Sequence, residues 1–239
     1  MQRYFGTRYD EENIRLCNDD IYHIFTVMRM KTGDVIEVIC EDSIFLCEVN
    51  VNRKNSFTIK KELEKKEEFI PKVTLILPLL KEQKMDFIFQ KTTELGVDEF
   101  LIIDMERSVI KLEKQDENKM AKKIDRWIKI CKEASEQSKR MKMPKITYLK
   151  DIEKLKNLDG IKLVCSTKDS IPSIKNILTE TPNYDRISIV IGPEGGITDK
   201  EENVLSNLGF IKVSLGSRIL RAETAPITVL SFINYEYMR

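Results

Sequence analysis

The sequence predicts two domains, a small all-β domain followed by a larger α/β domain with a largely parallel sheet. Residues 1 to 70 contain short runs rich in β-branched and aromatic residues, which is typical of strands. From residue 71 to 239, apolar strand-like runs alternate with amphipathic helical segments, and this alternation favours an α/β fold. The charged run KKELEKKEEF, residues 60 to 69, is expected to be a solvated linker between them.

The first domain is expected to be a small barrel or sandwich. Its predicted strands are DVIEVIC, IFLCEVNV and SFTIKKEL, and the turn-like segments EDS and NRKN separate them.

The second domain begins with a buried strand, KVTLILPLL, and a helix, KEQKMDFIFQKTTELG, in which Met85, Ile88, Phe89 and Leu95 share one face and Gly96 ends the helix. The next strand is VDEFLIID. A long helix follows, whose expected buried stripe is Met120, Ile124, Trp127, Ile128 and Cys131.

Three more strands are expected at IKLVCST, RISIVIG and FIKVSLG. Between the last two, Thr198 and Glu201 have the spacing of a capping box, and Gly209 would end the helix that they begin. Ligands of such sheets bind beyond the carboxyl ends of the strands, so the loops there are the places to search for a site.

Composition narrows the functional class. The chain has 239 residues, and 40 Lys/Arg against 39 Asp/Glu leave a net charge of +1, so any surface for nucleic acid must be local. Five scattered cysteines without a CxxC pair favour reduced thiols over disulfides or a zinc site. The start shows no signal-peptide core, and the longest strongly apolar run, VTLILPLL, is too short to cross a membrane. We therefore expect a cytoplasmic protein.

A glycine-rich segment, VIGPEGGITDKEE, follows one predicted strand. Its spacing of Gly192, Gly195 and Gly196 fits neither the dinucleotide fingerprint nor the P-loop. Glu194 would repel a phosphate, whereas a ligand with hydrogen-bond donors and positive charge, such as S-adenosylmethionine, fits better. A tight turn without a ligand explains the segment equally well.

A second glycine loop, in VSLGSRILRAETAPITVLSF, carries Arg218, Arg221 and Glu223 just before a helix that Thr224 is expected to begin. These charges are costly to bury without partners. They form either a surface ion pair or an anion-handling site beside the first loop.

Four segments, KMDFIFQKTTELGV, EQSKRMKMPKI, IGPEGGIT and LGSRILRAETA, occur in an order that closely resembles the RsmE-type ribosomal RNA uracil-N3 methyltransferases of the SPOUT superfamily. HIFTVMRMKTGD resembles the amino-terminal domain of that family, so the likeness runs nearly end to end. Ser217 and Pro226 stand where some relatives carry proline and alanine, and neither difference removes a polar group.

The resemblance implies a PUA-like β-barrel RNA-binding domain over residues 1–70 and a SPOUT-type, trefoil-knotted α/β methyltransferase domain over 71–239. It implies a homodimer that transfers a methyl group from S-adenosylmethionine, leaving S-adenosylhomocysteine, to N3 of a uridine in 16S ribosomal RNA of the small subunit. The assembled subunit is the expected context, and neither a metal nor a membrane is expected to take part.

The resemblance also assigns residues. The expected cofactor contacts are Thr167, Ile191, Gly192, Pro193, Glu194, Gly195, Gly196, Leu215, Gly216, Leu220, Thr224 and Ala225. Gln90 and Glu94, four residues apart on one helix face, are assigned to the substrate pocket, although a solvated helix surface would look the same.

Methylation of N3 requires loss of a proton and leaves negative charge on the flanking oxygens. The only histidine, His23, lies in the β domain, so we expect Arg221 and Arg218 to donate to these oxygens or to a phosphate. Glu223 is either the base, which would need a raised pKa, or the group that orients the arginine.

Basic residues are locally concentrated, because residues 105 to 150 hold 14 Lys/Arg and 7 Asp/Glu. This excess is either a solvated helix face or part of an RNA-binding surface. The expected RNA contacts are Arg3, Arg8, Arg29, Lys31 and Arg140.

Two other functions stay open at this point. A SPOUT-type ribose 2′-O-methyltransferase would share the fold, and identification of the modified nucleoside would separate the two reactions. A non-catalytic RNA-binding module would leave two glycine loops beside an Arg/Glu cluster unexplained, and a methyl-donor binding assay would test it.

Overall fold

The computed structural model describes residues 1–64, 71–111, 116–150, 152–180 and 184–237. The chain forms two compact units, one of residues 1–68 with 135–142 and the other of residues 69–134 with 143–239. The predicted boundary at residue 70 and most of the predicted linker, residues 65–69, lie outside the described residues. The first four linker residues belong to the last strand of the barrel.

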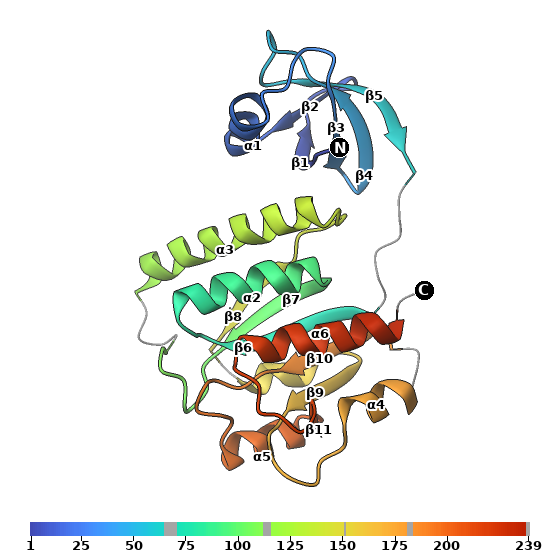
Figure 1. The fold of residues 1–239 in the computed structure, drawn as a ribbon. Coiled ribbons are helices and arrows are strands. Elements are labelled where there is room, and N and C mark those ends of the chain that lie inside the picture. Colours follow the sequence, from blue (N-terminus) through green and yellow to red (C-terminus); the bar gives the residue numbers. More distant parts are fainter. Residues whose placement is uncertain (65–70, 112–115, 151, 181–183, 238–239) are drawn as a thin grey trace. The chain divides into compact units, whose positions relative to one another are not determined.

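The first unit contains a closed barrel of five strands, which are labelled in Figure 1. Its strands are β1 (Arg3–Arg8), β2 (Asn13–Leu16), β3 (Val35–Cys40), β4 (Ser43–Glu48) and β5 (Phe57–Leu63), in the order β1-β2-β5-β4-β3. Parallel pairing of β1 with β3 closes it. The three predicted strands match β3, β4 and β5, whereas β1 and β2 were not predicted individually. A short helix, α1 (Asn18–Tyr22), runs into a π-helix, η1 (His23–Val27).

Residues 135–142 belong to the barrel unit although they follow a long stretch of the other unit. The buried Arg3 guanidinium pairs with Glu37 at 2.8 Å and donates to the carbonyl of Lys139. The ammonium of Lys139 pairs with Glu37 at 3.0 Å, and Met141 packs with Ile39 and Ile44. The barrel core is therefore completed by a segment that is distant in sequence.

The second unit is built on a six-stranded parallel sheet in the order β11-β9-β10-β6-β7-β8. The strands are β6 (Lys72–Pro78), β7 (Val97–Ile103), β8 (Lys145–Leu149), β9 (Ile161–Cys165), β10 (Arg186–Val190) and β11 (Ile211–Val213). The five predicted strands correspond to all of these except β8.

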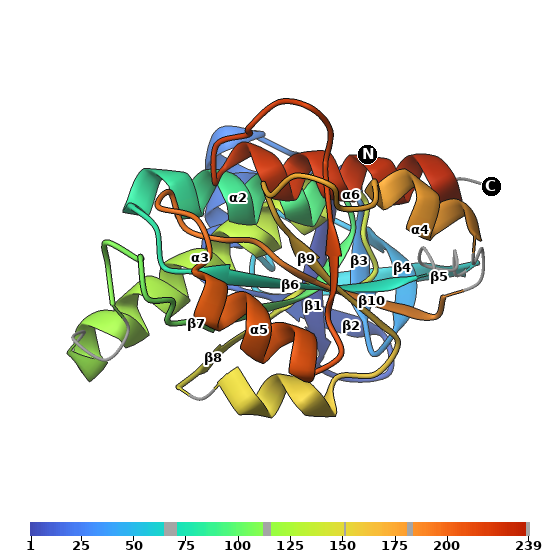
Figure 2. The ribbon, with the colours of Figure 1, turned by 90° about the horizontal axis from the view of Figure 1, so that it is seen from below.

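Helices cover both faces of this sheet (Figure 2). On one face lie α2 (Glu82–Glu94), α3 (Glu117–Gln137), α4 (Ile174–Glu180) and α6 (Thr224–Tyr237). On the other lie α5 (Asp199–Asn207) and the 3₁₀ helix η2 (Ile152–Asn157). Successive side chains of a β-strand point to opposite faces of the sheet, so β6 contributes to the hydrophobic core on each face. Leu75 and Leu77 face the first helix layer, and Ile76 faces the second.

The buried stripe of α3 is confirmed at Met120, Trp127 and Cys131, with Ile124 packed at its edge, but the prediction is wrong for Ile128. Ile128 is 44% exposed because it follows Trp127 and so lies about 100° around the helix from it. No helix among the described residues is long and apolar enough to cross a membrane.

Candidate functional site

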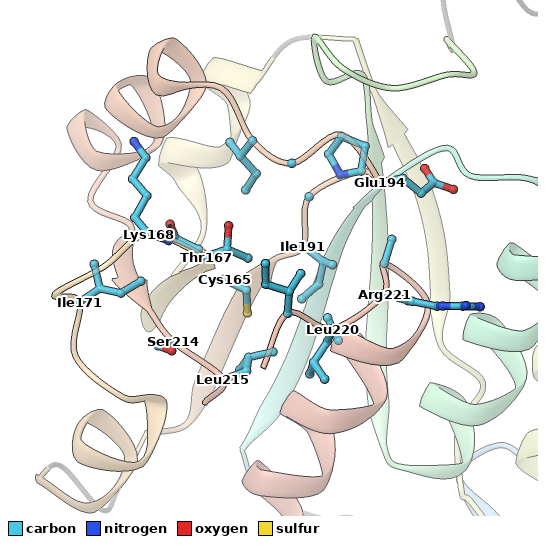
Figure 3. Close-up of a pocket in the computed structure, with 18 of the residues that line it drawn as sticks. Cys165, Thr167, Lys168, Ile171, Ile191, Glu194, Ser214, Leu215, Leu220 and Arg221 are labelled. Carbon is cyan, nitrogen blue, oxygen red and sulfur yellow. Dashed lines mark hydrogen bonds between the residues drawn. The ribbon is translucent and has the colours of Figure 1, made fainter. Parts of the chain in front are cut away.

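Three loops enclose a cavity of about 1010 Å³ at the carboxyl ends of β9, β10 and β11. They are residues 165–171 after β9, 191–197 after β10 and 214–222 between β11 and α6 (Figure 3). The three strands are neighbours in a parallel sheet, so the position agrees with the rule that ligands bind beyond carboxyl strand ends.

The middle of the cavity is apolar. Ile191, Leu215 and Leu220 lie close together in Figure 3, with the Cys165 thiol beside them. Burial raises the pKa of that thiol to about 12, so it stays protonated at neutral pH. An apolar centre with a polar rim is typical of sites for small molecules and cofactors.

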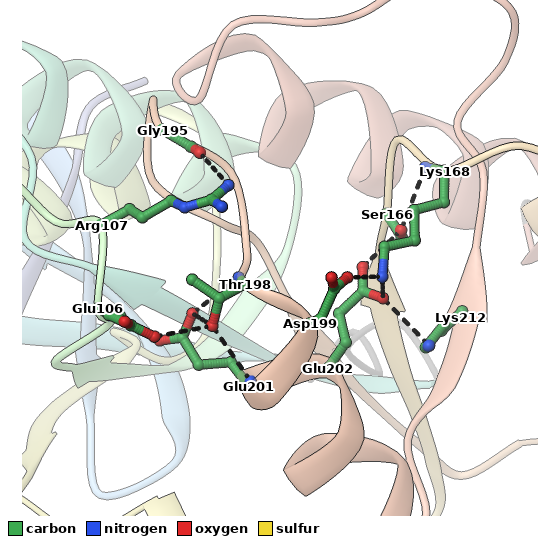
Figure 4. A network of polar contacts seen from close by, with 10 residues as sticks. All are labelled: Glu106, Arg107, Ser166, Lys168, Gly195, Thr198, Asp199, Glu201, Glu202 and Lys212. Atoms are coloured by element: carbon green, nitrogen blue, oxygen red, sulfur yellow. Dashed lines mark hydrogen bonds and ion pairs between the residues drawn. The ribbon is translucent and has the colours of Figure 1, made fainter.

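Polar contacts from a neighbouring loop fix the first glycine loop (Figure 4). The guanidinium of Arg107, after β7, donates to the carbonyl of Gly195 at 3.0 Å. Thr198 and Glu201 form the predicted capping box of α5, and the backbone N–H of Glu106 donates to the Glu201 carboxylate at 2.7 Å. Gly196 has φ +75°, a region that other residues rarely adopt, which explains a glycine at this turn.

Beside the cavity lies a buried carboxylate, Glu202, which is 2% exposed. It accepts a hydrogen bond from Ser166 at 2.7 Å and pairs with Lys168 at 2.8 Å and Lys212 at 3.1 Å (Figure 4). Burial opposes ionisation of Glu202, but the bonds from Lys168, Ser166 and Lys212 outweigh it and hold its pKa below the ordinary value. This charge is therefore compensated within the protein.

At the other end, the ammonium of Lys84 on α2 lies 3.0 Å from a carboxylate oxygen of Glu194 and 3.0 Å from one of Glu223. The bonds from Glu223 and Glu194 raise the pKa of Lys84. Burial opposes ionisation of Glu223, but the bond from Lys84 and the nearby Arg221 charge keep the Glu223 pKa below its ordinary value. A role of Glu223 as the base would need a raised pKa, and these contacts lower it instead.

Arg218 and Arg221 are exposed and line the cavity. In Figure 3, Arg221 and Glu194 extend to the same side, away from Lys168 and Ser214. Within the described part of the chain, neither arginine forms an ion pair. Both guanidinium groups are thus available to an anionic partner at the rim.

The structure brings most of the assigned residues to this cavity. Every expected cofactor contact except Thr224 lines it, as do Arg218 and Arg221, and Glu223 is joined to it through Lys84. Gln90 and Glu94 are exposed on α2 and do not line it; Glu94 pairs with Lys91 at 2.8 Å.

Several site residues were not predicted from the sequence. They are Lys84, Arg107, Ser166, Lys168 and Glu202. Arg107 and Lys168 follow predicted strands and Ser166 lies at the end of one, so the carboxyl strand end was a usable signal for these three. Lys84 opens the KMDFIFQ segment, but its partners are too distant in sequence for a pattern to join them.

The expected RNA contacts divide into two groups. Arg8, Arg29 and Lys31 are exposed on the barrel unit, and Arg140 is half-buried in it. Arg3 does not fit the expectation, because its guanidinium is buried and is already held by Glu37 and the carbonyl of Lys139. Its contacts give it a role in stabilising the barrel.

Comparison with known protein families gives two matches that cover different parts of the chain. Residues 66–234 match the RNA methyltransferase domain, and residues 16–62 match the RNA methyltransferase PUA domain. Fold and site thus define a two-domain RNA methyltransferase.

The chain belongs to the ribosomal RNA small subunit methyltransferase E family. It is 34% identical to the Bacillus subtilis protein of that name, with 99% of this chain and 97% of the relative covered. The Mesomycoplasma hyopneumoniae protein is 33% identical, with 97% and 98% covered. The Neisseria gonorrhoeae protein, solved with bound S-adenosylmethionine, has a TM-score of 0.86 at 26% identity, with 99% and 98% covered.

Proposed function

We propose that this protein transfers a methyl group from S-adenosylmethionine to N3 of a uridine in 16S ribosomal RNA. Family membership supports the rRNA substrate, and the Neisseria relative supports the methyl donor. The observation that carries the proposal is the pair of guanidinium groups, Arg218 and Arg221, which form no ion pair with any described residue and lie at the rim of a glycine-lined cavity. An enzyme that must stabilise a uracil anion beside a bound cofactor needs this combination.

The cavity fits S-adenosylmethionine. Ile191, Leu215 and Leu220 offer an apolar surface for the adenine ring, and the glycine loops let backbone groups approach ribose hydroxyls and the amino acid part. Glu194 at the rim suits a ligand with ammonium and sulfonium charges. When bound, this cofactor supplies an activated methyl group, and described residues offer no cluster of three or more His, Cys, Asp or Glu for a metal.

The residues of the chain then have separate tasks. Arg221, with Arg218 beside it, donates to the uracil oxygens that flank N3, and this lowers the pKa of the N3 proton by stabilising the anion. Glu223 is ionised and held by Lys84, so it positions the turn before α6 rather than taking the proton. We assign no described residue as the base, and the proton leaves to solvent.

We also propose that the enzyme is a homodimer. Helices α2 and α6 pack side by side, and Phe87, Phe232 and Tyr235 on them are exposed large apolar side chains. Large exposed apolar residues on neighbouring helices are candidates for an interaction surface. The family resemblance further leads us to propose that the loops around the cavity form a trefoil knot.

The barrel is proposed to bind RNA through Arg8, Arg29 and Lys31, with Arg140 contributing from the segment that completes it. We propose that the substrate is the assembled small subunit in the cytoplasm, since a folded particle presents a fixed RNA shape to two separate protein units.

Methyl transfer to small subunits that lack the modification, and to the naked RNA, tests the proposed function. Mass and retention of the labelled nucleoside should identify N3-methyluridine, with faster transfer to the assembled particle. A 2′-O-methylated nucleoside would replace this proposal with the ribose methyltransferase, and donor binding without transfer to either substrate would count against catalysis on this RNA.

A further inference from the structure

Lys84 joins three segments that are distant in sequence. Its ammonium, on the first turn of α2, lies 3.0 Å from Glu194 in the first glycine loop and 3.0 Å from Glu223 in the turn before α6. The Lys84 and Glu223 side chains are 28% and 16% exposed, so water screens this contact only in part. One cation thus bridges two carboxylates at the cavity rim.

The other charges near this point have different partners. Arg107 donates to the carbonyl of Gly195. On α2 itself, Glu82 and Asp86 pair with Arg126 of α3. Arg221 remains, two residues from Glu223 and close enough for its charge to favour ionisation of that carboxylate. If Lys84 were neutral, Arg221 would be a cation whose charge already acts on Glu223.

We propose that Lys84 is a positioning residue that keeps Arg221 free for the RNA substrate by occupying Glu223 and Glu194. The proposal rests on the function proposed above. It assigns to Lys84 no contact with the uracil or with the methyl donor. With Lys84 in place, the Arg221 guanidinium does not pair with a carboxylate of the protein. It can then donate two parallel hydrogen bonds to the uracil anion.

The test compares four variants with the wild type. Lys84→Met should lower single-turnover methyl transfer by about 10- to 100-fold, less than the loss of an oxyanion donor itself, because Arg221 is misdirected rather than removed. Lys84→Arg should keep most of the activity. The double variant Lys84→Met with Glu223→Gln should recover most of the loss, because Glu223, the carboxylate two residues from Arg221, no longer carries a charge. Arg126→Met is the matched control, since Arg126 also bridges two carboxylates on α2, and it should behave like the wild type.

A second measurement does not depend on turnover. Affinity of the donor-free protein for a uridine-containing RNA oligomer should fall in Lys84→Met and recover in the double variant. Thermal melting shows which variants fold, and Lys84→Gln replaces Lys84→Met if the latter does not.

Recovery in the double variant, in both measurements, would support the role of Lys84. A Lys84→Met enzyme with full rate, or a double variant no better than Lys84→Met, would overturn it. If the wild type itself makes no N3-methyluridine, the proposed function fails, and the RNA affinities still decide whether Lys84 keeps Arg221 available.

Discussion

Arg221 is the side chain on which the proposed chemistry depends most. Its guanidinium is exposed at the cavity rim and, among described residues, forms no ion pair. We expect Arg221→Ala to lower methyl transfer by about 10²–10³-fold, as for other donors that stabilise a developing anion. Affinity for S-adenosylmethionine should change much less, because a sulfonium gains nothing from a nearby arginine.

Single-turnover kinetics and calorimetry of the same preparations would measure both effects. Arg126→Ala, which removes an exposed arginine of α3, serves as the control. A fully active Arg221→Ala enzyme that still makes N3-methyluridine would mean that the active site lies elsewhere.

Glu223 offers a test that depends on pH. Because its pKa in the folded protein is lowered, it is ionised from pH 6 to 9, and Glu223→Gln should reduce the rate by less than about tenfold, with no rescue at high pH. A large defect that alkaline pH repairs would instead identify Glu223 as the base.

The lowered pKa of Glu223 also predicts how the stability of the protein depends on pH. The ionised carboxylate stabilises the fold above the unfolded-state pKa of about 4.3, and this contribution is lost as the pH falls through the lower folded-state pKa. The stability advantage of the wild type over Glu223→Gln in urea unfolding should therefore be present at pH 7 and vanish in strong acid.

Among the elements, α5 has the clearest structural role, because its first residues follow the glycine loop directly. Thr198 caps the helix and also donates to Glu106 at 3.0 Å. Thr198→Ala should lower the free energy of unfolding by about 1 kcal/mol, as is usual for the loss of an N-cap. It should weaken donor binding by less than about tenfold, because the loop loosens while its atoms remain.

Urea unfolding and calorimetry would measure both effects. Thr179→Ala is the matched control, since the hydrogen bonds of its hydroxyl to described residues go to carbonyls of its own helix, α4, and it should change neither quantity. Equal effects of the two substitutions would show that the capping box does not stabilise the donor-binding loop.

Elements with a strong local pattern could be predicted from the sequence, and those without one could not. The capping box and Gly209, with φ +88°, marked both ends of α5. Strand β8, KITYL, was missed because it has no buried residue and thus no apolar run. The two glycine loops of the site were predicted because they follow apolar strands. The lowered pKa of Glu223 was not, because it depends on Lys84, which lies far away in the sequence.

Assembly is the property of the whole molecule that can be tested most directly. If α2 and α6 form the dimer contact, Phe232→Glu should weaken association by about 2–4 kcal/mol, as a change at the centre of an interface does, and yield a folded monomer. Methyl transfer should fall with it, if the neighbouring subunit completes the pocket. Sedimentation and turnover at matched concentrations measure the two effects.

Ile128→Glu is the control for this test, because Ile128 is an equally exposed apolar residue on α3. It should leave both the dimer and the activity unchanged. An active Phe232→Glu monomer would contradict the proposal that the enzyme works as a dimer. A Phe232→Glu variant that still dimerises would show that the interface lies on another face.

The segment 135–142, which completes the barrel, has a consequence for how the protein is made. A ribosome releases the chain from its amino terminus, so the five strands emerge long before Lys139 and Met141, which contact Glu37, Ile39 and Ile44. The nascent barrel therefore stays incomplete, with part of its apolar surface in water, while β6, α2, β7 and most of α3 are synthesised. A fragment that ends after β5 would remain in that incomplete state, so its tendency to aggregate should be relieved by adding residues 135–142 as a separate peptide.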